Sequence, residues 1–382
     1  MKVISGAQVT STPGFKAGGI ASGVKSKNKL DLGILMSNVP ANTTAVYTTN
    51  SVKAAPLKVC VEHLADGMAQ AIVVNSGNAN CFTGKMGYAL AQNTTELTGT
   101  LLGIKKEDVL VASTGIIGQI LPYDKIAAAL PKLAKLVSSE NTAGESFAEA
   151  TLTTDKYAKS YGVEVEIDGK TVTIAGCAKG SGMLAPNMAT MLSFITTDCN
   201  IEQDLLRNAL SKSVNSSFNM ITVDGCMSTN DMVVVMANGY AKNSQIITKD
   251  KHCQIFQEAL THVCLELAKK LVRDGEGVTK FVEVVITGAP TEEDAKKAAF
   301  AVANSYLVKT AVFGENPNWG RVAQALGTIG LNITEDTLKI DFTSLKEKSV
   351  TIHADLGLGD KSATVYTSDL SYEYVRINAE YN

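Results

Sequence analysis

A run of small and irregular residues near the middle of the chain ends at Thr190 and could support self-cleavage. Two glycines and a proline make the approach irregular, and Ala189 places almost no bulk beside the Ala189–Thr190 peptide bond. If that bond breaks, Thr190 becomes an N-terminal residue that carries a hydroxyl nucleophile and its own amine as a base. Because an apolar run typical of a buried strand follows at once, we expect Thr190 to open a strand.

Other elements are expected to position this loop. Residues 163–174 alternate apolar and polar side chains on both sides of an Asp-Gly pair, which predicts a hairpin that leads into the loop. Elsewhere in the chain, segments with apolar residues at helical spacing alternate with short apolar runs. The periodicity predicts helices at 123–136, 202–214 and 251–272, and strands at 109–113, near 220–223 and at 281–287. We therefore expect a mixed α/β or α+β class.

A second loop could complement the first. Thr114 and Gly115 follow the short apolar run 109–113 and precede a predicted helix. A glycine can turn backbone N–H groups toward a bound oxygen, and a threonine hydroxyl can add a donor. From these residues alone the loop is either an oxyanion-binding loop or a plain turn from strand to helix.

Composition limits the function classes. With 382 residues, of which 45% are hydrophobic, the chain can form one large core or two medium ones. The net charge of −3 and the absence of a basic block argue against nucleic acid, so we expect a small-molecule partner. No apolar stretch fits a signal peptide or a membrane span, which predicts a cytoplasmic protein.

Cysteine and histidine usage narrows the chemistry further. The seven cysteines contain no CxxC pair, which favours reduced thiols over a disulfide framework or a zinc site. The four histidines belong to no GxSxG or HExxH pattern, and His252 and His262 fall in a segment of helical period. Hydrolytic or acyl-transfer chemistry would therefore need a base other than histidine.

The glycine loop has two other interpretations. Residues 180–185 match the GxGxxA spacing of a dinucleotide-binding loop. Pro186 argues against that site, because a Rossmann glycine loop must open a helix and proline disfavours a helical residue before it. The loop could also be a surface turn without chemistry.

Residues 179–192 closely resemble the autoprocessing motif of the ornithine acetyltransferases. This family is also called the bifunctional glutamate N-acetyltransferase/amino-acid acetyltransferase family of arginine biosynthesis. The resemblance extends over the whole chain, in order, through blocks at 14–18, 46–50, 54–56, 73–80, 113–118, 153–155, 223–225, 228–231, 274–277, 318–321 and 377–379. Two departures, at 81–82 and 226–227, replace residues that are usually smaller or more polar in the family.

The resemblance implies residue roles. Thr190 would be the nucleophile, and cleavage of the Ala189–Thr190 bond would give the chains 1–189 and 190–382. Thr114 and Gly115 would form the oxyanion hole. The substrate contacts implied by the resemblance are Thr153, Lys179, Thr190, Glu276 and Asn378. A further contact, a Ser or Thr five residues after Asn378, has no counterpart in the printed sequence.

The resemblance also implies a reaction and a fold. An acetyl group would pass from N2-acetylornithine to Thr190 and then to glutamate, with no metal or redox cofactor, and acetyl-CoA is a second acetyl donor to be tested. Two copies of each fragment would associate, without nucleic acid or membrane partners. The fold implied is the N-terminal-nucleophile-like αββα arrangement of packed sheets flanked by helices. Two alternatives stay open: an N-terminal-nucleophile aminopeptidase or amidase that passes the acyl group to water, and a non-catalytic binding protein.

Overall fold

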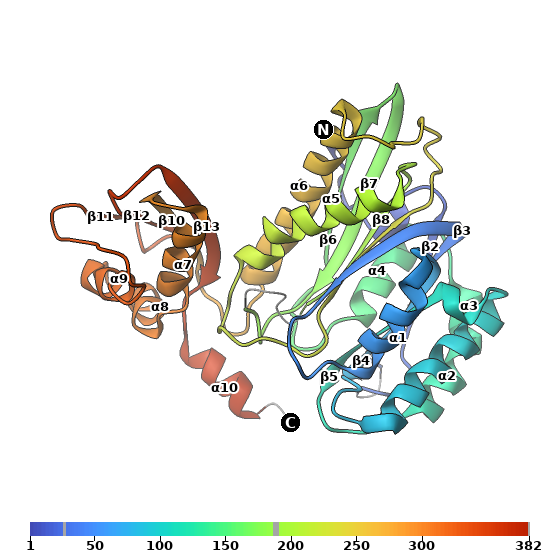
Figure 1. Ribbon diagram of the computed structural model, residues 1–382. Helices are drawn as coiled ribbons and strands as arrows, with labels where there is room; N and C mark the ends of the chain where they lie inside the picture. The colour runs from blue at the N-terminus through green and yellow to red at the C-terminus, as the bar shows by residue number, and fades with distance from the viewer. Residues whose placement is uncertain (26–27, 186–190, 381–382) are drawn as a thin grey trace.

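The computed structural model describes residues 1–25, 28–185 and 191–380 (Figure 1). The predicted cleavage site, Ala189 and Thr190, lies outside the described residues. Within them, nine strands form the larger sheet, in the order β1-β6-β7-β8-β9-β3-β4-β5 with β2 paired to β3. Their bounds are β1 Lys2–Val3, β2 Phe15–Ile20, β3 Leu32–Tyr47, β4 Met68–Asn78, β5 Val109–Ile116, β6 Lys159–Ile167, β7 Lys170–Lys179, β8 Leu192–Thr197 and β9 Met232–Ala237.

This sheet is buried on both faces. β9 is apolar throughout, and its successive side chains point to opposite sides. Val233 and Val235 enter a core that contains residues of α5 (Gln203–Asn215) and α6 (Lys251–Arg273). Met232 and Val234 enter a second core, which also contains residues of the helices that lie on the other side in Figure 1. These helices are α1 Ala55–His63, α2 Gly84–Leu102, α3 Tyr123–Leu136 and α4 Asn141–Ala150.

The hairpin predicted around the Asp-Gly pair is confirmed as β6 and β7. Asp168 and Gly169 have φ values of 53° and 66°, the left-handed conformation that a two-residue hairpin turn requires. The strands extend beyond the predicted 163–174, because Lys159 still pairs with Ala178. β7 therefore ends at Lys179, directly before the glycine loop.

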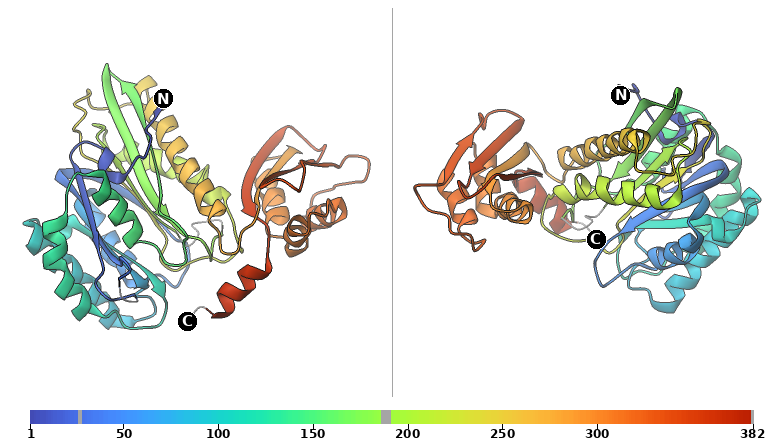
Figure 2. Two further views of the ribbon diagram at one scale, coloured as in Figure 1. Left: turned by 180° about the vertical axis from the view of Figure 1, so that it is seen from behind. Right: turned by 45° about the horizontal axis from the view of Figure 1, so that its top comes forward.

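A smaller sheet forms in the C-terminal part of the described chain. Its four strands, in the order β11-β12-β10-β13, are β10 Phe281–Ala289, β11 Lys339–Phe342, β12 Ser349–Asp355 and β13 Lys361–Ser368. Three helices lie with this sheet: α7 Glu292–Ala303, α8 Tyr306–Phe313 and α9 Trp319–Leu326. The final helix, α10 (Tyr372–Glu380), runs from this unit back toward the carboxyl end of β5, as Figures 1 and 2 show. The expected α/β architecture of sheets flanked by helices is confirmed.

The strand predicted near 220–223 is wrong. A short 3-10 turn, Phe218–Met220, is followed by irregular backbone with one isolated bridge from Ile221 to Tyr366. The Thr222 N–H donates to the carbonyl oxygen of Tyr366 on β13 at 3.0 Å, and the Val223 N–H donates to that of Leu184 in the glycine loop at 2.9 Å. This backbone is therefore satisfied by single contacts to two different segments rather than by a strand ladder. Ile221 and Val223 are buried, which explains the apolar signal.

None of the helices in the described ranges combines the length and the apolar composition that crossing a bilayer requires.

The raised pKa of Asp198, which directly follows β8, predicts that the stability of the fold depends on pH. Its Oδ1 accepts the Thr173 N–H at 2.7 Å, and burial raises the pKa of its carboxyl to about 6. A raised folded-state pKa gives stability that is lost as pH rises through that value. Lowering the pH from 7.5 to 5 should therefore raise the free energy of unfolding of the wild type, relative to Asp198→Asn, by about 1 kcal/mol. Urea denaturation at both pH values checks this, and an unchanged difference would contradict it.

Candidate active site

Six of the residues predicted to form the site line the same cavity, of about 100 Å³. They come from the ends of strands β5 and β7, from loops and from the helix α10. These residues are Thr114, Gly115, Thr153, Lys179, Glu276 and Asn378. In the glycine loop the cavity lining extends as far as Met183. The described chain continues to Ala185 and resumes at Met191, the first residue after the predicted nucleophile.

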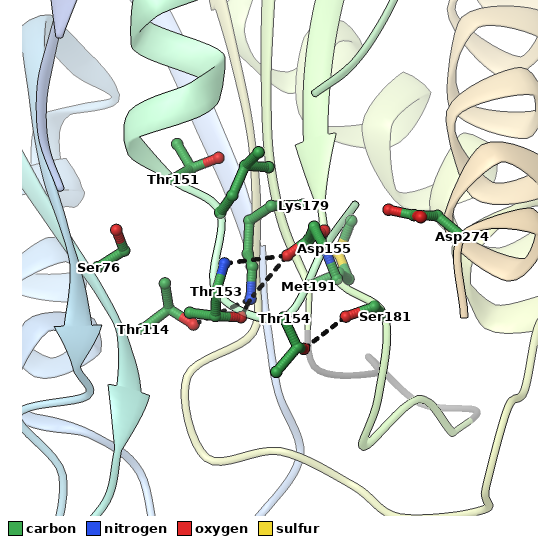
Figure 3. Close-up of polar contacts among 12 residues, drawn as sticks. Ser76, Thr114, Thr151, Thr153, Thr154, Asp155, Lys179, Ser181, Met191 and Asp274 are labelled. Atoms are coloured by element: carbon green, nitrogen blue, oxygen red, sulfur yellow. Dashed lines mark hydrogen bonds and ion pairs between the residues drawn. The ribbon is translucent and has the colours of Figure 1, made fainter. Parts of the chain in front are cut away.

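Lys179 lies at the centre of the site. It ends β7 with only 2% of its surface exposed. Its Nζ donates to the hydroxyls of Thr114 at 3.2 Å and of Thr153 at 2.9 Å (Figure 3). Burial lowers the pKa of Lys179, while the nearby Asp155 opposes that shift. Because both hydroxyl oxygens accept from Lys179, both hydroxyl protons remain available to a bound molecule.

Asp155 organises the surroundings of Lys179. Its Oδ1 accepts the Gly180 N–H at 2.7 Å, and its Oδ2 accepts the Thr153 N–H at 3.1 Å. Oδ2 also lies 3.9 Å from Lys179 Nζ. Burial opposes ionisation, but the ammonium groups of Lys179 and Lys159 hold the pKa of Asp155 well below its usual range.

Lys159, which sequence reasoning missed, completes a buried ion cluster. Its Nζ lies 2.6 Å from Asp155 Oδ1 and 2.5 Å from Asp274 Oδ2, and all three side chains are fully buried. Asp274 belongs to the same loop as Glu276. The cluster therefore connects the loop that carries Thr153 to the loop that carries Glu276.

Glu276 and Asn378 meet across two parts of the chain. Asn378 Nδ2, on α10, donates to Glu276 Oε2 at 2.8 Å. The Glu276 N–H donates to the carbonyl oxygen of Ser181 at 2.8 Å. A Cβ on Gly182 would lie 2.2 Å from the same Oε2, so the glycine leaves room for this carboxylate. Packing against Glu276 therefore explains why position 182 is a glycine. A dinucleotide-binding loop is not needed to explain it.

A steric constraint also explains the glycine at position 115. Its φ is 134°, and a Cβ there would come within 2.3 Å of the Gly77 backbone on β4. The carboxyl ends of the parallel strands β4 and β5 therefore approach closely at this point, and Thr114 and Gly115 face the cavity.

Two further side chains hold the loops around the site. Asn230 Nδ2 donates to the carbonyl oxygens of Ala79 and Ser113, both at 2.7 Å. The Asp224 carboxylate accepts the Leu184 N–H at 2.9 Å and the Tyr374 hydroxyl at 3.2 Å. In the sequence both residues fall in blocks of the family resemblance, 223–225 and 228–231, to which no role was assigned.

Comparisons with known proteins identify the family of this chain. The ArgJ family model matches residues 16–346 and 342–382. The chain belongs to the ArgJ family. A relative from Oceanobacillus iheyensis, named arginine biosynthesis bifunctional protein ArgJ, is 46% identical, and the alignment covers 100% of this chain and 98% of that protein. A relative of the same name from Geobacter sulfurreducens is 43% identical over 96% of this chain and 98% of its own length.

Among solved structures, ornithine acetyltransferase from Mycobacterium tuberculosis, complexed with ornithine, is 34% identical with a TM-score of 0.46. The alignment covers 48% of this chain and 97% of that chain. The family resemblance predicted from the ordered motifs is confirmed by the family model and the full-length relatives.

Removing Lys159 should destabilise the fold strongly. Lys159→Met keeps the length of the side chain but leaves two buried carboxylates without their cation, which typically costs about 3–5 kcal/mol. Lys2→Met is the matched control, because Lys2 pairs with Glu164 at an exposed edge and should contribute little. Urea denaturation measures both, and equal free energies of unfolding would contradict the role of the cluster.

Proposed function

We propose that this chain is a self-cleaved N-terminal-threonine acetyltransferase of arginine biosynthesis. It would transfer the acetyl group of N2-acetylornithine to glutamate through an acetyl-Thr190 intermediate, giving ornithine and N-acetylglutamate. The observation that carries the proposal is the convergence of the six described site residues on one cavity. Membership of the ArgJ family supports it.

Maturation is the first step of the proposal. The Thr190 hydroxyl attacks the carbonyl carbon of Ala189, and an N-to-O acyl shift converts the peptide bond into an ester. Water then hydrolyses the ester and frees the Thr190 amine. The products are a chain of residues 1–189 and a chain of residues 190–382.

Acetyl transfer follows in two halves. The Thr190 amine takes the hydroxyl proton, directly or through water, while the oxygen attacks the acetyl carbonyl of N2-acetylornithine. Ornithine leaves with that proton, and the glutamate amine then attacks the acetyl-enzyme. In both halves the Thr114 hydroxyl and the Gly115 N–H would stabilise the oxyanion, and one such donor is typically worth about 2.7–4 kcal/mol.

Lys179 and Glu276 suit a substrate with charge at both ends. The Lys179 ammonium can pair with a substrate carboxylate, and the Glu276 carboxylate with a substrate amine. Both are almost fully withdrawn from solvent, at 2% and 9% exposed, so both pairs are strengthened by the low local polarity. The Thr153 hydroxyl, which accepts from Lys179 at 2.9 Å, adds a donor beside it.

The proposed chemistry uses no metal or redox cofactor, because nucleophile, base and oxyanion donors all come from the chain. Acetyl-CoA is proposed as a second acetyl donor, since the relatives are named bifunctional. We also propose a cytoplasmic enzyme in which two copies of each fragment associate, without nucleic acid or membrane partners.

The proposal predicts cleavage and acetyl transfer. Intact-mass measurement should find two fragments, 1–189 and 190–382, for the wild type and a single chain for Thr190→Ala. The wild type with N2-acetylornithine and glutamate should form N-acetylglutamate. Uncleaved wild type would contradict self-processing, and acetate as the main product would favour the aminopeptidase or amidase alternative. Replacing N2-acetylornithine with acetyl-CoA tests the second donor.

Gly182→Ala should impair substrate binding more than turnover. The added methyl group would displace the Glu276 carboxylate, so we expect the KM for N2-acetylornithine to rise about tenfold with little change in kcat. Gly320→Ala is the control, because a Cβ there meets its nearest atom at an ordinary 3.4 Å. Steady-state kinetics of both variants decide this, and equal KM values would rule out the steric role of Gly182.

A further inference from the structure

A second hollow in the described surface, of about 490 Å³, has no role in the mechanism above. It lies where α1 and α2 begin, two helices that pack against each other, and we call it the α1–α2 pocket. Its volume falls in the range of pockets that bind small molecules. The active cavity, of about 100 Å³, is too small to enclose a nucleotide.

The α1–α2 pocket is a direct neighbour of the active cavity. Ala79 lines the active cavity, and Phe82, three residues later, lines the α1–α2 pocket. Consecutive Cα atoms are about 3.8 Å apart, so the Cα atoms of these two residues are at most about 11 Å apart. Ala54, directly before α1, packs with Ala79 and donates its N–H to the carbonyl oxygen of Thr229 at 3.0 Å. Thr229 also lines the active cavity.

Both charged residues that line the α1–α2 pocket are lysines. Lys53 precedes α1, and Lys58 lies in the first turn of this helix. Both side chains are exposed, and neither forms an ion pair with a described residue. The chain as a whole carries a net charge of −3, so this pocket concentrates positive charge against the overall balance. Such a local excess favours a negatively charged ligand.

An exposed aromatic ring stands at the same pocket. Phe82 has 78% of its surface exposed, and its φ of 60° is uncommon for a bulky residue. The adjacent Cys81 is fully buried, and its carbonyl oxygen accepts the Gly118 N–H at 3.0 Å, so the backbone that carries the ring is anchored. Planar bases stack on such rings, and ammonium groups bind phosphates. The combination suits a base that is joined to phosphate groups.

We propose that the α1–α2 pocket binds the nucleotide end of acetyl-CoA, with Lys53 and Lys58 on its phosphates and Phe82 against its adenine ring. This inference rests on the proposed function, which makes acetyl-CoA a second acetyl donor. Acetyl-CoA is far larger than the active cavity, so most of the molecule must lie outside when its thioester carbonyl reaches Thr114 and Gly115. The extended pantetheine arm is long enough to connect the two neighbouring cavities.

The two acetyl donors would then share the oxyanion donors but differ in what else holds them. N2-acetylornithine has charged groups that Lys179 and Glu276 can pair with inside the active cavity. The nucleotide of acetyl-CoA is held outside that cavity, by residues that the sequence analysis assigned no role. Substitutions in the α1–α2 pocket should therefore act on binding of the nucleotide-bearing donor.

Paired substitutions separate charge and ring from shape. Lys53→Met with Lys58→Met removes both charges and keeps the side-chain length, whereas Lys53→Arg with Lys58→Arg keeps both charges. Phe82→Ala removes the ring, and Phe82→Tyr keeps it. Lys251→Met is the matched control, because Lys251 lines another hollow, of about 410 Å³, at the start of α6. Asp274, near the active cavity, follows the opposite end of this 23-residue helix, roughly 35 Å away.

Isothermal titration calorimetry of the purified full chain with CoA, which carries no acetyl group, tests the proposal. We expect the double methionine variant to bind CoA about tenfold more weakly than the wild type, the usual scale for two exposed charge pairs. Phe82→Ala should weaken binding about fivefold or more, since a base loses its stacking partner. The double arginine variant, Phe82→Tyr and Lys251→Met should bind CoA as the wild type does. ADP, which lacks the pantetheine arm, should respond to the same substitutions.

The outcomes separate this proposal from the proposed function. Weaker CoA binding by the double methionine variant and by Phe82→Ala, with binding kept by the charge- and ring-preserving variants, supports the nucleotide site. A wild type that binds no CoA would overturn it, as would equal loss of affinity in Lys251→Met or ADP binding that ignores the lysine substitutions. A wild type that forms no N-acetylglutamate from N2-acetylornithine would instead refute the proposed function, and calorimetry would still decide the nucleotide site.

Discussion

Lys159 carries its charge into a fully buried position between the carboxylates of Asp155 and Asp274. Buried charges persist only when they are paired and hydrogen-bonded, so the three side chains must be brought together as the chain folds. Asp155 then receives the backbone N–H groups of Gly180 and Thr153. The same interaction that makes the lysine tolerable therefore fixes the ends of two loops around the cavity.

The position of Lys179 follows from this arrangement. Its ammonium lies 3.9 Å from Asp155 Oδ2 and donates hydrogen bonds to the hydroxyls of Thr114 and Thr153. Because each hydroxyl oxygen accepts a hydrogen bond from Lys179, its own proton is available for donation toward the cavity. The buried cluster of Lys159, Asp155 and Asp274 thus holds the charged group whose hydrogen bonds orient the hydroxyls that line the cavity. The cluster contacts the proposed substrate residues Thr153 and Lys179 directly, through Asp155 Oδ2.

Close backbone approach is the second constraint on the site. Gly115 lets β5 approach β4, and Gly182 lets the glycine loop pack against Glu276. Neither position has room for a side chain without displacement of a neighbour. These two glycines therefore allow the end of β5 and the Glu276 carboxylate to line the same cavity. Their presence is a steric requirement of the folded chain rather than a sign of a phosphate-binding loop.

Local patterns were enough to predict much of this protein. The Asp168–Gly169 turn predicted the hairpin, since its left-handed backbone favours such residues, and helical spacing predicted α5 and α6. The ordered motifs predicted the family and six cavity residues. The segment near 220–223 was mistaken for a strand because burial alone produced its apolar pattern.

Tertiary structure decided which charged groups are buried. Asn378 reaches Glu276 across 102 residues of sequence, and Lys179 reaches Thr114 across 65. In a sequence Lys159 and Asp231 are ordinary charged residues, which are expected at the surface. Only long-range packing surrounds Lys159 with two carboxylates and buries Asp231 completely. Burial and partner are properties of the folded chain, because they arise from residues that are distant in sequence.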